Sequence, residues 1–148
     1  MKSLKLLLIM SFSLFLSGCK KNSEEPKTTT ELLTLGPWKM IEETWNPNNA
    51  GWTDFYPGVP TCLKDNSIAY HLDLSVLADE GPTKCNVSDP QTIPGTWYLY
   101  PTGTKYSVTI NGSTTDYDIL ELNEHVLKIY FKVTATPSVT EYKATLIH

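Results

Sequence analysis

The sequence contains no arginine, few cysteines and no long uninterrupted apolar run, and these absences narrow the possible functions. All twelve basic residues are lysines, sixteen acids outnumber them, and the formal net charge is −4. Nucleic-acid binding depends on clustered Lys and Arg, so the composition argues against a nucleic-acid partner. The hydrophobic fraction of 41% and the charged fraction of 19% are typical of a globular protein. The length of 148 residues predicts a single domain.

The first eighteen residues have the layout of a secretory signal. Lys2 and Lys5 precede an apolar stretch over residues 6–16, which is shorter than the roughly 20 apolar residues that a membrane-spanning helix needs. Leu16-Ser17-Gly18-Cys19 follows and resembles the lipobox of bacterial lipoproteins. The resemblance implies cleavage before Cys19 and attachment of several acyl chains, which anchor a protein stably without spanning the membrane. The alternative is a buried apolar helix with an incidental cysteine.

Residues 19–31 are expected to form a flexible tether, because residues 20–30 include no large apolar side chain. In Gram-negative lipoproteins an aspartate after the cysteine signals retention in the inner membrane, whereas here Lys20 follows it. Lysine followed by Glu24-Glu25 resembles signals that send lipoproteins to the outer face. We therefore expect a lipid-anchored protein of the outer membrane, facing the periplasm or the cell surface, with the surface favoured.

Residues 32–148 predict one all-β domain. No stretch of about 10–12 residues keeps a helical apolar period, and prolines and glycines recur at short intervals. Asn111-Gly112 predicts a tight hairpin, because both residues tolerate a positive φ. Eight strands are expected near residues 38–45, 67–73, 75–79, 96–99, 106–110, 117–121, 127–133 and 141–146.

These strands are expected to close into a single antiparallel up-and-down barrel. Strands with one apolar and one polar face, joined by short turns, form a meander, and closure removes its exposed edges. Eight strands leave an interior that holds either packed side chains or one small ligand. A two-sheet sandwich is the alternative, and the tight connections favour the barrel. The expected core residues are Trp38, Trp97, Tyr106, Val108, Leu127, Ile129 and Phe131.

Two cysteines, Cys62 and Cys85, remain once Cys19 carries lipid. An exported protein lies in an oxidising compartment, so we expect these two to form a disulfide, with two free buried thiols as the alternative. A zinc site is not expected, because no further cysteine remains and the three histidines lack the spacing of metal ligands.

A series of short motifs resembles the lipocalin-like domain lipoproteins of Gram-negative bacteria. Gly36-Pro37-Trp38 is similar to the G-x-W start of lipocalins. The motifs that follow it in order are Cys62-Leu63-Lys64-Asp65, Asp79-Glu80-Gly81, Lys84-Cys85, Asp89-Pro90-Gln91 and Gly95-Thr96-Trp97. The resemblance covers residues 32–148 and implies a small lipocalin-like barrel with a Cys62–Cys85 pair. It implies no catalytic residue, because the biochemical role of that family is generally undefined.

No catalytic constellation stands out in the chain. It has no Gly-rich phosphate loop and no G-x-S-x-G motif. His71 and Asp73 are expected on a solvated strand face, and Asp79-Glu80 lacks the ligand density of a calcium loop. We therefore expect a protein that is not an enzyme and that uses neither a metal nor another cofactor.

Aromatic residues concentrate around the first long loop, at Trp45, Trp52, Phe55 and Tyr56. The first long loop of a lipocalin-type barrel covers the mouth, and function often concentrates in such loops. These rings either face a ligand or partner, or plug one end of the barrel as ordinary core. The leading hypothesis is an outer-membrane-anchored lipoprotein whose barrel binds a small apolar or amphipathic ligand. The alternative is an accessory lipoprotein with a filled barrel, which acts through protein contacts of residues 45–60.

Overall fold

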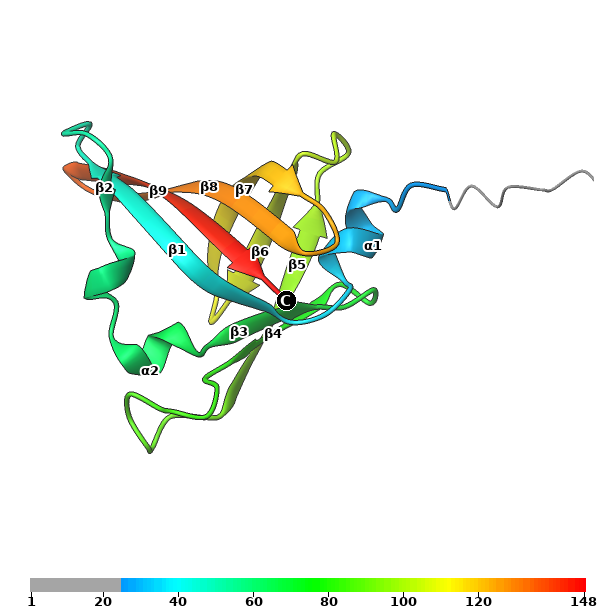
Figure 1. The fold of residues 1–148 in the computed structure, drawn as a ribbon, viewed down its shortest axis with the longest axis horizontal. Coiled ribbons are helices and arrows are strands. Elements are labelled where there is room, and N and C mark those ends of the chain that lie inside the picture. Colours follow the sequence, from blue (N-terminus) through cyan, green and yellow to red (C-terminus); the bar gives the residue numbers. More distant parts are fainter. Residues whose placement is uncertain (1–24) are drawn as a thin grey trace, which may run out of the picture.

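A computed structural model describes residues 25–148, in which eight antiparallel strands close into a barrel (Figure 1). The barrel strands pair in chain order, and pairing between the first and the last closes the ring. This confirms the predicted all-β up-and-down barrel over the sandwich. The strands are β1 (Trp38–Pro47), β2 (Thr53–Asp54), β3 (Ser67–Tyr70), β4 (Ser75–Asp79), β5 (Thr92–Leu99), β6 (Lys105–Ile110), β7 (Ser113–Leu122), β8 (Val126–Ala135) and β9 (Ser138–Ile147).

The two-residue strand β2 stands outside the barrel count, because it only extends the edge of β1. The predicted signal (residues 1–18) and the predicted lipidation site Cys19 lie outside the described residues, so both stay predictions. Within residues 25–148, no helix is both long and apolar enough to cross a membrane.

Residues 25–148 also include three short helices, one before the strands and two between β2 and β3, although the sequence periodicity predicts none. They are α1 (Thr29–Leu33), η1 (Tyr56–Gly58) and α2 (Thr61–Lys64), each too short to display an apolar period. A capping box starts α1: Thr28 Oγ1 accepts from the Glu31 backbone N–H, and the Glu31 carboxylate accepts from the Thr28 N–H. Helix α1 and its cap at Thr28 therefore overlap the segment that was expected to be a flexible tether up to residue 31.

Helix α1 closes the end of the barrel at which β1 begins, and we call this the closed end (Figure 1). Leu33 and Trp38 are both 0% exposed, and the Trp38 indole N–H donates to the Leu33 carbonyl at 2.9 Å. The Thr29 hydroxyl donates to the Gly103 carbonyl in the β5–β6 turn at 3.1 Å. These contacts hold α1 against the barrel.

The centre of the barrel is filled by aromatic and aliphatic side chains. The Tyr70 hydroxyl donates to the Tyr106 hydroxyl at 3.2 Å, and burial raises the pKa of both phenols above their ordinary value. The buried core comprises Leu33, Trp38, Tyr70, Val76, Trp97, Tyr106, Val108, Leu127, Ile129, Ala144 and Leu146. Phe131, the remaining residue of the expected core, is partly buried and packs against this set.

Turn geometry accounts for where several strands end. Asn111 and Gly112 have φ of 51° and 76° and connect the paired residues Ile110 and Ser113, as the Asn-Gly signal predicts. The strand expected over residues 67–73 stops at Tyr70, because residues 71–74 form a turn. His71 and Asp73 therefore lie in a turn and not on a strand face.

A disulfide between Cys62 in α2 and Cys85 in the β4–β5 loop confirms the expected pairing. It joins the connection between β1 and β3 to the connection between β4 and β5, at the end of the barrel opposite α1.

Candidate functional site

The end of the barrel opposite the closed end is called the mouth. It is formed by the connections β1–β3, β4–β5, β6–β7 and β8–β9, since antiparallel strands bring alternate connections to the same end. Figure 1 shows β2, the ends of β1 and β8 and the start of β9 extending away from α1. The mouth is thus the end of the barrel that α1 does not cover.

Five aromatic rings inside the mouth form a continuous cluster, which we call the mouth cluster. Its members are Trp45, Phe55, Tyr142, Phe131 and Tyr117, and successive ring centroids are 4.9, 6.4, 4.9 and 5.2 Å apart. Trp45 pairs with Tyr142 and Tyr117 pairs with Phe131, and cross-strand partners share a face of the sheet. The cluster continues into the core, because the Tyr117 ring stacks on the Tyr106 ring at 5.1 Å.

The structure separates the four aromatic residues that the sequence grouped together. Trp45 and Phe55 belong to the mouth cluster. Trp52 lies on the outer face, 40% exposed, with the Lys143 Nζ 4.1 Å from its ring centroid. The Tyr56 hydroxyl donates to a backbone carbonyl of β1 at 3.1 Å. Only two of the four residues therefore face the barrel interior together, and a ligand or partner role for all four stays a prediction.

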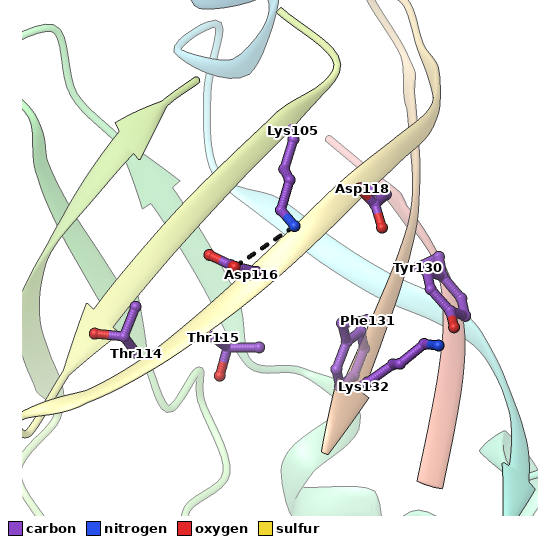
Figure 2. Close-up of a pocket in the computed structure, with 8 residues that line it drawn as sticks. All are labelled: Lys105, Thr114, Thr115, Asp116, Asp118, Tyr130, Phe131 and Lys132. Carbon is purple, nitrogen blue, oxygen red and sulfur yellow. Dashed lines mark ion pairs between the residues drawn. The ribbon is translucent and has the colours of Figure 1, made fainter. Parts of the chain in front are cut away.

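A hollow of about 430 Å³ opens in the barrel wall beside the mouth cluster. Pairing between β7 and β8 reaches only Tyr117 and Phe131, although β7 begins at Ser113 and β8 continues to Ala135. The two strands separate beyond this point, and their separation leaves the hollow. Its lining, shown in Figure 2, consists of Lys105, Thr114, Thr115, Asp116, Asp118, Tyr130, Phe131 and Lys132.

The hollow has a mainly polar and charged lining, with the Phe131 ring of the mouth cluster on its inner side. Phe131, which stacks on Tyr142, is the lining residue that belongs to the mouth cluster. On the rim, Lys105 Nζ is 3.5 Å from Asp116 Oδ2, and this ion pair is drawn in Figure 2. An apolar surface and polar groups therefore meet within one concave site.

The second rim lysine, Lys132, belongs to a network around Glu141. The Lys132 Nζ is 3.1 Å from Glu141 Oε1, the Tyr130 hydroxyl donates to the same oxygen at 2.6 Å, and the Asn46 amide donates to Oε2 at 3.0 Å. The hydrogen bond from Tyr130 and then that from Lys132 hold the pKa of Glu141 below its ordinary value. Both rim lysines are thus already paired, whereas the Asp118 side chain has no hydrogen bond or ion pair within residues 25–148.

A further residue of the mouth, Glu43, was missed by sequence reasoning. A bulge in β1 between Met40 and Glu42 shifts the alternation of the strand, so Glu43 pairs with the buried Ala144 and shares its inner face. Burial raises the pKa of the Glu43 carboxyl. The sequence did hold a signal, because Met40 and Trp45 can both point inward only if one residue is inserted between them.

Two further hollows lie elsewhere in the wall. One of about 290 Å³ lies where β1 and β3 pair at only two positions, and its lining includes Trp38, Met40 and Leu63. The other, of about 260 Å³, lies on the outer face over β1, β8 and β9. None of the three hollows is lined by Tyr70 or Trp97 at the centre of the barrel.

Within the part of the chain that the structure describes, no three His, Cys, Asp or Glu side chains gather closely enough to hold a metal ion. The carboxylate of Asp73 accepts hydrogen bonds from the Ser75 backbone N–H and hydroxyl, at 2.9 and 2.6 Å. These bonds lower the pKa of Asp73 and are those of an ordinary turn.

No protein-family model matches the chain, and no curated protein matches it. The likeness to lipocalin-like domains therefore rests on the quoted motifs and on the closed eight-stranded barrel, which has the architecture that the motifs imply.

Proposed function

We propose that the protein is a lipid-anchored binding protein of the outer membrane, without enzymatic activity, whose mouth binds one small amphipathic ligand. The observation that carries this proposal is the hollow of about 430 Å³ between β7 and β8. Small-molecule sites typically measure about 300–1,000 Å³ and combine apolar walls with a few polar groups.

The chemistry of the hollow supports an amphipathic ligand over a purely apolar one. Phe131 and the rings behind it offer an aromatic surface on which an apolar body can pack. Lys105, Asp116 and Tyr130 at the rim offer charged and hydroxyl groups that can contact polar parts of a ligand. A ligand with both parts would satisfy both surfaces.

The position of the N-terminal segment supports the orientation of an anchored protein. The described chain starts at residue 25 and enters the barrel through α1 at the closed end. Five residues separate Cys19 from Glu25, and the six steps between their Cα atoms span at most about 20 Å in a fully extended chain. If Cys19 carries lipid, the closed end stays near the membrane and the mouth faces away from it.

A second candidate function is contact with a protein partner through the outer face. The observation that favours it is the exposed Trp52 ring, which lies against Lys143 and 6.5 Å from the Tyr130 ring. Aromatic residues of this kind are enriched at the energetic centre of protein interfaces.

Ligand titration with two matched variants tests the proposal. The purified protein is titrated with fatty acids, sterols, bile-type amphiphiles and alkyl amines, and binding is followed by calorimetry, melting temperature and tryptophan fluorescence. We expect at least one class to bind with a stoichiometry of one. Trp45→Ala is expected to weaken that binding about tenfold or more, because it removes a wall of the mouth cluster.

Trp52→Ala is the control, since it removes the same side chain from the outer face. It should change the affinity by less than about twofold, which corresponds to the effect of an ordinary surface substitution. Cooperative thermal unfolding of both variants establishes that each is folded. Absence of binding by every class, or equal losses in the two variants, would overturn the proposal.

A further inference from the structure

Glu43 is a carboxylate on the inner face of a barrel whose other inward positions at that level are apolar. It pairs across the sheet with Ala144, which pairs with Ile129, which in turn pairs with Ile119. These three partners are aliphatic and belong to the core or pack against it. Glu43 is therefore the charged member of an apolar layer.

The Glu43 carboxylate makes no hydrogen bond or ion pair within the described chain. The neighbouring lysines of β8 and β9 are directed elsewhere, since Lys128 pairs with Glu121 and Lys143 lies over Trp52 on the outer face. Partly buried polar groups are usually paired, because desolvation without a partner costs free energy. An ionisable group held in this way is a typical feature of a functional site.

Aromatic rings flank Glu43 on the side of the mouth. Trp45 is the next inward residue of β1, one full pleat away. The Phe55 backbone N–H donates to the Glu43 carbonyl at 2.9 Å, which holds the Phe55 ring beside this part of β1. The Trp45 and Phe55 rings are 4.9 Å apart. The partner across the sheet, Ala144, contributes only a methyl group.

We propose that the ligand of the mouth carries a cationic head group, an amine or a quaternary ammonium, which pairs with the Glu43 carboxylate beside the Trp45 and Phe55 rings. This inference rests on the proposed ligand-binding function and specifies the ligand class. A carboxylate attracts the cation, and the faces of aromatic rings stabilise it further. An anionic head would instead meet an unpaired carboxylate in Glu43 and rim lysines that already have partners.

Three ligands with one alkyl chain and different heads test the inference: octyltrimethylammonium, 1-octanol and octanoate. Each is titrated calorimetrically into the whole protein and into Glu43→Gln and Asp118→Asn. Asp118→Asn is the comparison variant, because Asp118 at the rim of the hollow is the alternative carboxylate for the cation. We expect octyltrimethylammonium to bind most tightly, and Glu43→Gln to weaken its binding about tenfold while leaving 1-octanol within about twofold.

The outcomes separate this inference from the proposed function. Tight binding of 1-octanol or octanoate, unaffected by Glu43→Gln, would overturn the cationic head group and leave the ligand-binding function standing. Loss of octyltrimethylammonium binding in Asp118→Asn but not in Glu43→Gln would also overturn it, by placing the cation at the rim. Absence of binding by all three ligands would count against both proposals.

Discussion

Glu43 is the residue at which stability and function conflict most clearly in this molecule. Its carboxylate faces an apolar layer of the barrel, and burial raises its pKa above the ordinary 4.5. The charged form is therefore less favourable in the folded chain than in the unfolded chain. A residue that only stabilised the barrel would be apolar here, and this is why we propose a binding role for Glu43.

The raised pKa of Glu43 predicts a pH-dependent effect of Glu43→Gln on stability. The folded state binds the carboxyl proton of Glu43 more tightly than the unfolded state does. The stability that this proton contributes is fully present below the unfolded pKa and is lost as the pH rises through the folded pKa. At pH 7 without ligand, Glu43→Gln should therefore unfold at a higher urea concentration than the unchanged protein. The gap should narrow as the pH falls towards 4.5.

Urea unfolding of both proteins at several pH values measures this difference. Asp118→Asn serves here as the control for loss of one acid. A Glu43→Gln stability difference that stays constant between pH 7 and pH 4, or that grows on acidification, would contradict the desolvation of Glu43.

At the scale of elements, the mouth is held together by a covalent link between two of its connections. Cys62 in α2 and Cys85 in the β4–β5 loop are 23 residues apart, and their disulfide closes that stretch of chain. Asp65, which follows α2, accepts from the Thr83 backbone N–H at 3.0 Å and also from the Thr83 hydroxyl. The two loops therefore contact each other through hydrogen bonds as well as through the disulfide.

Replacement of both cysteines by serine should lower the free energy of unfolding strongly, while the barrel fold is retained. Loop-closure entropy for a stretch of this length amounts to about 3 kcal/mol in the free energy of unfolding. The double variant Cys62→Ser/Cys85→Ser should show this decrease in urea unfolding and keep the far-ultraviolet spectrum of a β protein. An unchanged free energy of unfolding would show that the disulfide does not constrain the chain.

Alternation and turn signals predicted most barrel strands well, because these features are local. β6 and the Asn111-Gly112 hairpin follow directly from the sequence. The bulge in β1 and the separation of β7 from β8 do not, because both depend on how the closed ring adjusts its register. As a result Trp45 and Phe55 could be anticipated at the mouth, whereas Glu43 and the hollow could not.

Over the whole molecule, the two ends of the barrel differ in construction. The closed end is sealed by α1 and by the buried Trp38, and the chain enters there. The mouth carries the aromatic cluster, the hollow between β7 and β8, and Glu43, whose carboxylate has no partner within residues 25–148. A filled centre with a hollow beside the aromatic end leaves room for only part of a ligand.

The four tryptophans occupy four distinct places and can report where a ligand lies. Trp38 is at the closed end, Trp97 in the core, Trp45 in the mouth cluster and Trp52 on the outer face. Fluorine NMR of the protein labelled with 5-fluorotryptophan gives one signal for each position. This measurement therefore resolves the site of binding within one titration.

Titration of the labelled protein with octyltrimethylammonium tests the central claim most directly. The account predicts that the Trp45 signal shifts in a saturable way, while the Trp38 and Trp52 signals stay in place. A shift confined to Trp52, or four unchanged signals at saturating ligand, would contradict a ligand-binding mouth.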